Sequence, residues 1–251
     1  EWRANTRPEL TALVDDRDAA YTYAQLRAET ERRAGGWAGL GAGSGDVVAV
    51  VAKNSADFLL HAFALMRAGA TPAFVNWRLS PRELAEVLAL VEPKAIAADA
   101  EFAGLVSAAW AEPLPRVVIG GGPVAEGWLD GAALSGPSGV SGVSGSTPPR
   151  PALTGDTVLA LVHTSGTTGR AKAIPLRHGA LMMSVADFAI EIGDQVAGSR
   201  HLQILPLFHL GGFGQCMQAI LTAGTVYIHT AFNPAAVIDA IETDRIEFFT
   251  A

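Results

Sequence analysis

Cysteine and basic residues are scarce in this sequence, and each scarcity excludes a class of protein. Cys216 is the single cysteine among 251 residues, so no disulfide can form within the chain. A reducing cytoplasm is therefore the simplest compartment to expect. The 18 Lys and Arg residues are outnumbered by 25 Asp and Glu, which gives a net charge of −7. This balance argues against a general nucleic-acid binder, because such proteins carry a basic patch.

Long apolar runs are also missing. A membrane helix needs ~20 consecutive apolar residues. The longest candidate, Phe58 to Met66, is short, contains His61 and stops at Arg67. The N-terminus, which begins Glu1-Trp2-Arg3, has no signal-peptide core. Because hydrophobic residues make up 49% of the chain, we expect a globular, cytoplasmic protein with a sizeable core and no membrane span.

Both ends of the sequence are unusual for a complete protein. Position 1 is not Met, and residues 246–251 have the apolar character of a buried strand. Natural termini are usually loose and polar. We therefore expect the chain to be part of a longer protein.

Strand-like and helix-like segments alternate along the chain. The run from Val47 to Ala52 is entirely apolar, which is typical of a strand covered on both faces. Further strands are expected at 70–75, 95–98, 117–119, 158–162, 201–205, 225–229 and 246–251. Helices are expected between them, with caps at Asn54 or Ser55, Ser80, Gly224 and Asn233. The alternation predicts an α/β fold with parallel sheets and right-handed crossovers.

One segment interrupts the alternation. Residues 135–151 are rich in Ser and Gly and end in a Pro-rich stretch. Such a composition cannot bury a core and is typical of a surface loop. We therefore predict a first α/β subdomain over 1–134 and a second over 152–251.

The segment 163–172 follows a predicted strand and carries the densest group of hydroxyl side chains. Gly166 and Gly169 allow a sharp turn that brings backbone N–H groups close to an anion. Hydroxyl donors and a lysine suit a polyphosphate, and ligands of open α/β sheets bind at the carboxyl ends of strands. The segment is not a Walker A loop, and an exposed polar turn is the alternative. The predicted phosphate-binding residues are Thr164, Ser165, Gly166, Thr167, Thr168, Gly169 and Lys172.

These residues resemble the signature T-S-G-T-T-G-x-P-K-G of the adenylate-forming enzymes. That family includes acyl-CoA synthetases, firefly luciferase and the adenylation domains of peptide synthetases. Here Ala171 and Ala173 replace the usual Pro and Gly, which changes loop stiffness more than chemistry. Similar matches to the family are YTYAQL at 21–26, LMRAGA at 65–70, NWRLS at 76–80 and RH at 177–178. The resemblance implies two stacked α/β subdomains with largely parallel sheets flanked by helices, within the large N-terminal domain of such an enzyme.

A second motif, LPLFHLGGF at 205–213, resembles a PLFHxxG run of the acyl-CoA synthetase branch. The resemblance implies a substrate pocket at His209, with Phe208, Gly211 and Gly212 shaping its wall. A structural histidine is the alternative for His209. Relatives that activate amino acids carry an Asp near this point, but nothing acidic lies between His201 and Tyr227. Fatty acids or other simple carboxylic acids are therefore the expected substrates.

The resemblance implies that a carboxylate attacks ATP to give an acyl adenylate, which then passes to coenzyme A, with Mg²⁺ bridging the phosphates. The adenine-binding motif, the ribose-binding Asp and the lysine of the mobile C-terminal domain all lie beyond the family position that Ala251 matches. We therefore assign no catalytic residue and expect the chain alone to be inactive without its missing C-terminal portion. The alternatives are a non-catalytic nucleotide- or acyl-binding module and a ligase that loads a carrier protein. No metal site formed by protein residues is expected, because the His residues and Cys216 lack ligand-like spacing.

Overall fold

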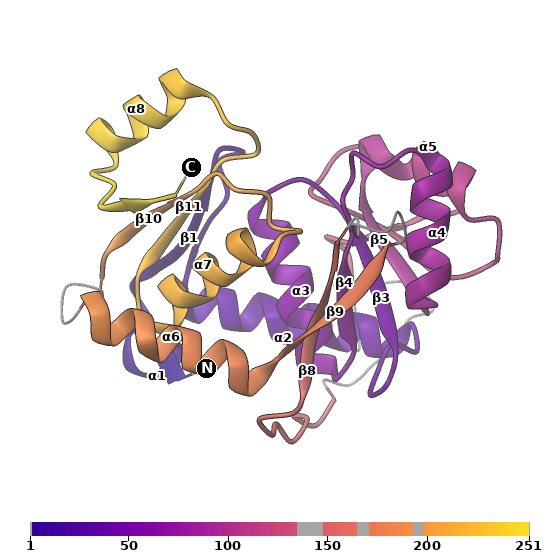
Figure 1. Cartoon of the computed structure of the whole chain (residues 1–251), viewed down its shortest axis with the longest axis horizontal. Helices are drawn as coiled ribbons and strands as arrows, with labels where there is room; N and C mark the ends of the chain where they lie inside the picture. The colour runs from indigo at the N-terminus through magenta and orange to yellow at the C-terminus, as the bar shows by residue number, and fades with distance from the viewer. Residues whose placement is uncertain (1, 135–147, 165–170, 193–197, 251) are drawn as a thin grey trace. The chain divides into compact units, whose positions relative to one another are not determined.

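The computed structural model describes residues 2–134, 148–164, 171–192 and 198–250 and contains two mixed sheets dominated by parallel pairs (Figure 1). The first sheet has the order β12 (Phe248–Phe249), β10 (Arg200–Gln203), β11 (Thr225–Ile228), β1 (Thr11–Asp15), β2 (Ala20–Thr22). The second has the order β7 (Leu129–Asp130), β6 (Arg116–Ile119), β5 (Ala95–Asp99), β3 (Val47–Val51), β4 (Thr71–Phe74), β8 (Val158–Thr164), β9 (Lys172–Arg177). Helices flank both sheets, so the predicted α/β class is confirmed.

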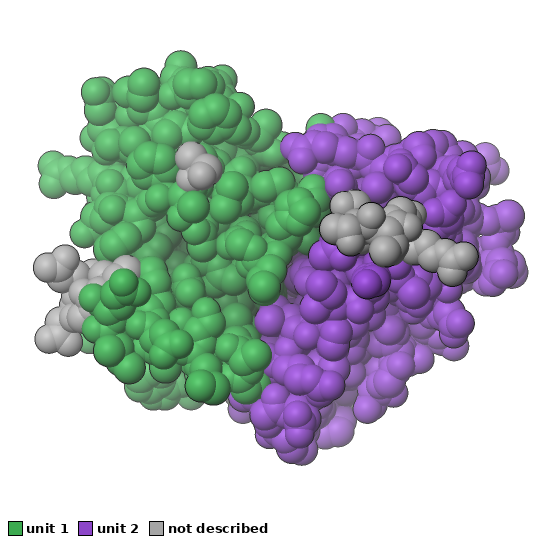
Figure 2. Space-filling model, viewed as in Figure 1, with its two compact units in different colours: residues 1–29, 53–56, 179–251 green, residues 30–52, 57–178 purple. Residues whose placement is uncertain are grey.

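The chain divides into two compact units, each built around one sheet (Figure 2). Unit 1 comprises 1–29, 53–56 and 179–251, and unit 2 comprises 30–52 and 57–178. Both units are discontinuous in sequence, which differs from the continuous stretches 1–134 and 152–251 expected above. The difference arises because β1 pairs with β11 and β4 pairs with β8, and an apolar pattern does not reveal which strands become neighbours.

The helices occupy the segments between the strands. Their bounds are α1 (Trp2–Thr6), α2 (Tyr23–Gly39), α3 (Ala56–Ala68), α4 (Pro81–Val91), α5 (Ala103–Ala109), α6 (His178–Ile192), α7 (Leu210–Leu221), α8 (Pro234–Thr243) and the short 3₁₀ turn Ala100–Phe102. Among the described helices, none has the length and apolar character that crossing a bilayer requires.

Two of the expected helix caps are confirmed and one is corrected. Ser80 accepts from the Glu83 N–H while the Glu83 carboxylate accepts from the Ser80 N–H, a complete capping box. Asn233 accepts from the first N–H groups of α8. Gly224 was predicted as the cap at the end of α7, but the C-cap residue is Thr222. Ala223 has the left-handed conformation, with φ of 68°, and Gly224 donates its N–H to Ala219 O.

The strand β9 was not predicted. It pairs with β8 in antiparallel register and lies at the edge of its sheet. Its sequence, KAIPLR, contains Pro175, and a proline weakens the sequence signal of a strand. An edge strand tolerates proline because one side of it makes no ladder hydrogen bonds. Thr164 and Lys172, at the two described ends of the expected phosphate loop, are therefore cross-strand partners of an antiparallel pair.

The core of unit 2 lies on both faces of its sheet. On one face, side chains of β3, β5 and β6 pack against α4 and α5, with Leu84, Leu88 and Val106 fully buried. The helix α3 covers the other face (Figure 1), where the Phe58 ring lies 5.1 Å from the ring of Phe74 on β4. Burial on both faces explains why the β3 run is continuously apolar.

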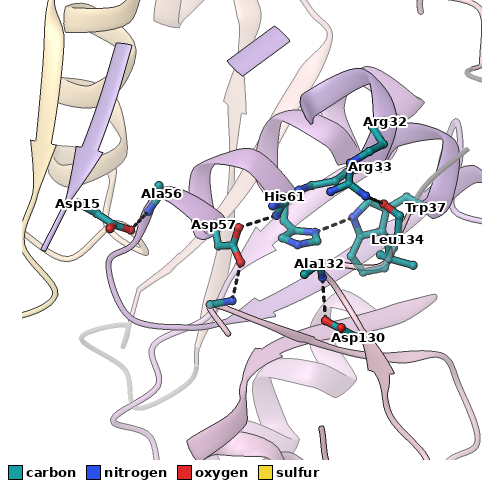
Figure 3. A network of polar contacts seen from close by, with 11 residues as sticks. Asp15, Arg32, Arg33, Trp37, Ala56, Asp57, His61, Asp130, Ala132 and Leu134 are labelled. Atoms are coloured by element: carbon teal, nitrogen blue, oxygen red, sulfur yellow. Dashed lines mark hydrogen bonds and ion pairs between the residues drawn. The ribbon is translucent and has the colours of Figure 1, made fainter. Parts of the chain in front are cut away.

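A buried polar network joins α2, α3 and the segment after β6 in unit 2 (Figure 3). Arg33 forms an ion pair with Asp57 at 2.7 Å, and the Gly120 N–H donates to the same carboxylate. Trp37 Nε1 donates to His61 Nδ1 at 3.2 Å, and both side chains are fully buried. Burial and the nearby Arg33 charge lower the pKa of His61 to about 3, so this imidazole is neutral at neutral pH.

Candidate functional site

The described ends of the predicted phosphate loop lie at the open end of the β8–β9 hairpin. Thr164 closes β8, Lys172 opens β9, and the two residues are cross-strand partners. Both side chains are exposed. The predicted residues Ser165, Gly166, Thr167, Thr168 and Gly169 lie outside the described residues. The structure thus brings a hydroxyl and an ammonium group together at the base of the loop.

A histidine anchors the start of this loop to the sheet. The β4–β8 ladder pairs Ala73 with Leu161 and Phe74 with Val162. One residue later, His163 Nδ1 lies 3.0 Å from Phe74 O. Because a carbonyl oxygen only accepts, Nδ1 carries the proton in this contact. The side chain therefore extends the attachment of β8 by one residue toward Thr164.

The motif segment 205–209 of unit 1 is held by a buried asparagine that the sequence analysis expected only as a helix cap. Asn54 Nδ2 donates to Leu205 O at 2.9 Å and to His229 O at 3.2 Å, while its Oδ1 accepts from Leu207 N at 2.8 Å. The backbone N–H that opens α3, at Ala56, is instead bonded by Asp15 Oδ2. The position of Asn54 after the β3 strand is the only sequence signal for this role.

The four predicted pocket residues take different positions at the start of α7. Phe208 is buried, and its ring lies 4.5 Å from the ring of His209, which is exposed at the N-cap position. Gly211 is exposed, whereas Gly212 is buried. A Cβ atom on Gly212 would lie 2.3 Å from Pro206 O, so only glycine allows this approach. Their role in binding a substrate stays a prediction.

Unit 1 contains a small cavity of about 90 Å³ between its sheet and the helices α6 and α7. Three rings contribute to its lining: the His201 ring stacks on Phe248 at 4.9 Å, and Phe188 lies 6.4 Å from each of them. Polar groups come from Gln203, Gln215, Gln218 and Thr250. These residues form no sequence motif, because they are widely separated along the chain.

Cys216 also lines the cavity, and its burial determines whether its thiol is reactive. The side chain is 1% exposed, and burial raises the pKa of the thiol far above its ordinary value. A protonated thiol is a poor nucleophile, so Cys216 acts as a packing residue. Within 2–134, 148–164, 171–192 and 198–250, no group of three His, Cys, Asp or Glu residues could hold a metal ion.

Comparison with known families is decisive for the fold and the motifs described above. The family model described as "AMP-binding enzyme" matches residues 1–251. The chain belongs to this family. The predicted resemblance to adenylate-forming enzymes is thereby confirmed.

The curated relatives of this AMP-binding enzyme chain are longer than the chain itself. A feruloyl-CoA synthase of Amycolatopsis sp. is 34% identical over 245 residues, which cover 97% of this chain and 46% of that protein. An indoleacetate–CoA ligase of Aromatoleum aromaticum is 33% identical and is matched over 98% of this chain and 48% of its own length. The chain therefore spans about half the length of the curated relatives that it matches.

A solved structure shares the same fold. The inhibitor-bound N-terminal domain of FACL13 from Mycobacterium tuberculosis superimposes with a TM-score of 0.83 at 26% identity. The superposition covers 100% of this AMP-binding enzyme chain and 61% of that one. The architecture of both units is therefore that of an N-terminal domain of this family.

Proposed function

We propose that this chain is the N-terminal part of an ATP-dependent acid–thiol ligase. In the proposed reaction, a substrate carboxylate oxygen attacks the α-phosphorus of ATP, which forms an acyl adenylate and releases pyrophosphate. The thiol of coenzyme A then attacks the acyl carbon, which forms a thioester and releases AMP. The names of the two curated relatives, both CoA ligases of aromatic acids, support this class.

The observation that carries the proposal is the pairing of Thr164 with Lys172 at the base of the signature loop. A hydroxyl donor and an ammonium group on one face of a hairpin fit the oxygens of a polyphosphate. Lys172 would neutralise phosphate charge, and Thr164 would orient a phosphate oxygen. Mg²⁺, which favours phosphate and carboxylate oxygens, would supply further charge neutralisation when bound with ATP.

Unit 1 would contribute the binding of the acyl group. Asn54 fixes the 205–207 backbone, and α7 carries Gln215 and Gln218 from this segment to the cavity. Phe208 and Gly212 keep the start of α7 closely packed, and His209 is exposed beside them. In this proposal the segment positions the acid, and chemistry depends on parts of the parent protein beyond Ala251.

Carboxylate-dependent exchange between ATP and labelled pyrophosphate, measured with the full-length parent, tests the proposal. We expect exchange that requires an acid, and thioester formation when coenzyme A is added. This chain alone should give no exchange, although it should bind ATP. A folded full-length parent that binds ATP but gives no exchange with any acid would instead favour a non-catalytic binding module. Supplying a carrier protein in place of coenzyme A would identify a carrier-protein ligase.

A further inference from the structure

We infer that Tyr23 and Arg3 are positioning residues: their hydrogen bonds fix the C-terminal end of α7 and thereby the α7 side chains of the proposed acyl site. This pair is the α7 clamp, and it lies with α7 in unit 1. Tyr23 belongs to the motif YTYAQL at 21–26, to which neither the phosphate loop nor the acyl site gives a role. The inference deepens the proposed function and rests on it for its kinetic test.

The motif builds the start of α2 and fixes Tyr23 there. Thr22 N donates to Gln25 Oε1 at 2.8 Å, and Gln25 N donates to Thr22 Oγ1 at 3.2 Å, which is a reciprocal capping box. Tyr23 is the first residue of the helix, and its backbone N–H donates to Leu10 O. Its side chain is 3% exposed, and burial raises the pKa of the phenol well above its ordinary value. The hydroxyl therefore stays a hydrogen-bond donor at neutral pH.

The carbonyl groups at the end of α7 accept from the clamp. Tyr23 Oη lies 2.7 Å from Gly224 O and 3.1 Å from Ile220 O. The guanidinium of Arg3 donates to Leu221 O through Nε, at 2.8 Å, and through Nη2. The last carbonyl groups of a helix have no partner within it, and a cation near them also interacts favourably with the helix dipole. The clamp therefore meets a need that the helix cannot meet alone.

The sequence of α7 explains why its C-terminal end requires support. Three of its first five residues, LGGFG, are glycines, which are poor helix formers. The start of the helix therefore contributes little helical stability of its own. Gln215, Cys216 and Gln218 line the cavity from the part of α7 between these glycines and the clamp. Without the clamp, we expect this part of α7 to be placed less precisely.

Two substitutions each remove one side of the clamp. Tyr23→Phe keeps the buried ring and removes only the hydroxyl, and Arg3→Met removes the guanidinium. Arg3→Lys is the conservative companion, because an ammonium group can still donate to Leu221 O. The matched control is Asn233→Ala, which removes the side-chain cap of α8 and so weakens a different helix of unit 1.

The first measurement is the rate at which dithionitrobenzoate labels Cys216 in this folded chain without denaturant. Cys216 is the single cysteine and is buried on α7, so its labelling rate reports local opening of that helix. We expect Tyr23→Phe and Arg3→Met to be labelled about tenfold faster than the wild type, the effect of one good hydrogen bond. Arg3→Lys should restore most of the protection, and Asn233→Ala should be labelled at the wild-type rate.

The second measurement is pyrophosphate exchange by the full-length parent, with whichever of benzoate, cinnamate and decanoate gives the fastest exchange. Tyr23→Phe and Arg3→Met should raise the KM for the acid about threefold or more, because misplaced side chains bind the acid less well. The values of kcat and of the KM for ATP should stay unchanged, since Thr164 and Lys172 belong to unit 2. A general loss of stability would not separate the two KM values.

Three results would overturn the inference: wild-type labelling rates in both clamp variants, an equal rise in Asn233→Ala, or an unchanged KM for the acid. If Tyr23→Phe does not fold, Arg3→Met, Arg3→Lys and the control still decide. Labelling needs no substrate, so it separates the inference from the proposed function. Exchange with an unchanged KM for the acid discards the inference alone. A parent that gives no exchange discards the ligase, and faster labelling then still supports the clamp.

Discussion

Thr164 and Lys172 face each other as the last cross-strand pair of an antiparallel hairpin. Directly opposite residues on neighbouring strands present their side chains on the same face. The hydroxyl and the ammonium group therefore belong to one surface, at the point where the TSGTTG segment leaves and re-enters the sheet. The placement follows from β9, which the sequence analysis did not predict.

Lys172→Met should weaken ATP binding by this chain about tenfold, because one charge-assisted contact to phosphate is lost. Arg177→Met is the matched control, since Arg177 is an exposed cation on the same strand whose guanidinium bonds Asp156 O. It should leave ATP binding unchanged. Equal ATP affinity in the wild type and Lys172→Met, measured by calorimetry, would contradict the assignment of Lys172.

Gly212→Ala should lower the free energy of unfolding by about 1–3 kcal/mol, because the new Cβ clashes with Pro206 O. Gly214→Ala, two residues further along the same helix, meets no atom within 4 Å and should raise it by about 0.5–1 kcal/mol. Urea denaturation followed by circular dichroism measures both. A destabilised Gly214→Ala would show that α7 packs differently.

Asn54→Ala should lower the free energy of unfolding by about 2–3 kcal/mol, because it removes three hydrogen bonds. Leu207 N and His229 O then lose the partner that Asn54 provides. Asn54→Asp is the informative companion: its oxygen can still accept from Leu207 N but cannot donate to the two carbonyls. Asn54→Asp should therefore be less stable than the wild type, and urea denaturation of the three proteins measures the difference. Equal stability of the three proteins would contradict the role assigned to Asn54.

Stability should fall in mild acid. The unfolded pKa of His61 is 6.5 and its folded pKa is about 3, so the unfolded state binds more protons between these values. The free energy of unfolding therefore has its full value above pH 6.5 and decreases as the pH falls toward 3. The loss attributable to His61 amounts to about 3 kcal/mol by pH ~4.5. His61→Asn, whose oxygen can still accept from Trp37 Nε1, should remove that part of the pH dependence in denaturation experiments.

Ala223→Gly should stabilise the chain by about 1 kcal/mol, because Ala223 holds a left-handed conformation with φ of 68° that glycine adopts without strain. Gly224→Ala should do the opposite, since its Cβ would approach Ser199 O to 2.9 Å. Thermal denaturation of the two variants gives the comparison. Equal melting temperatures would show that the cap after α7 tolerates either residue in both places.

The sequence predicts elements well where local chemistry decides them and less well where long-range pairing does. The capping box at Ser80 and the cap at Asn233 depend on neighbouring residues only, and both were predicted. The strand β9 was missed because Pro175 weakens its signal and only its pairing with β8 makes it a strand. Two hydrogen-bond partners of Asn54, Leu205 and His229, lie 151 and 175 positions away along the chain, and no local sequence pattern reveals contacts at such separations.

The same distinction applies to the candidate site. The phosphate-loop residues are contiguous, so a motif identifies them. The cavity residues come from α6, β10, α7, β11 and β12, and only folding brings them together. Gln203 belongs to neither sequence motif, and only the fold places it in the lining of the cavity.

The pairing of β1 with β11 also has a consequence for biosynthesis. Thr225 Oγ1 donates to Thr11 O across a separation of 214 residues. On the ribosome, β1 can pair with β2 early, but it must wait for almost the whole described chain before its parallel partner β11 exists. The pairings among β3, β4, β5 and β6 can form much earlier. An unpaired strand edge is a template for aggregation. The nascent chain therefore carries an open edge at its beginning for most of its synthesis, and slow translation before residue 225 would prolong that exposure.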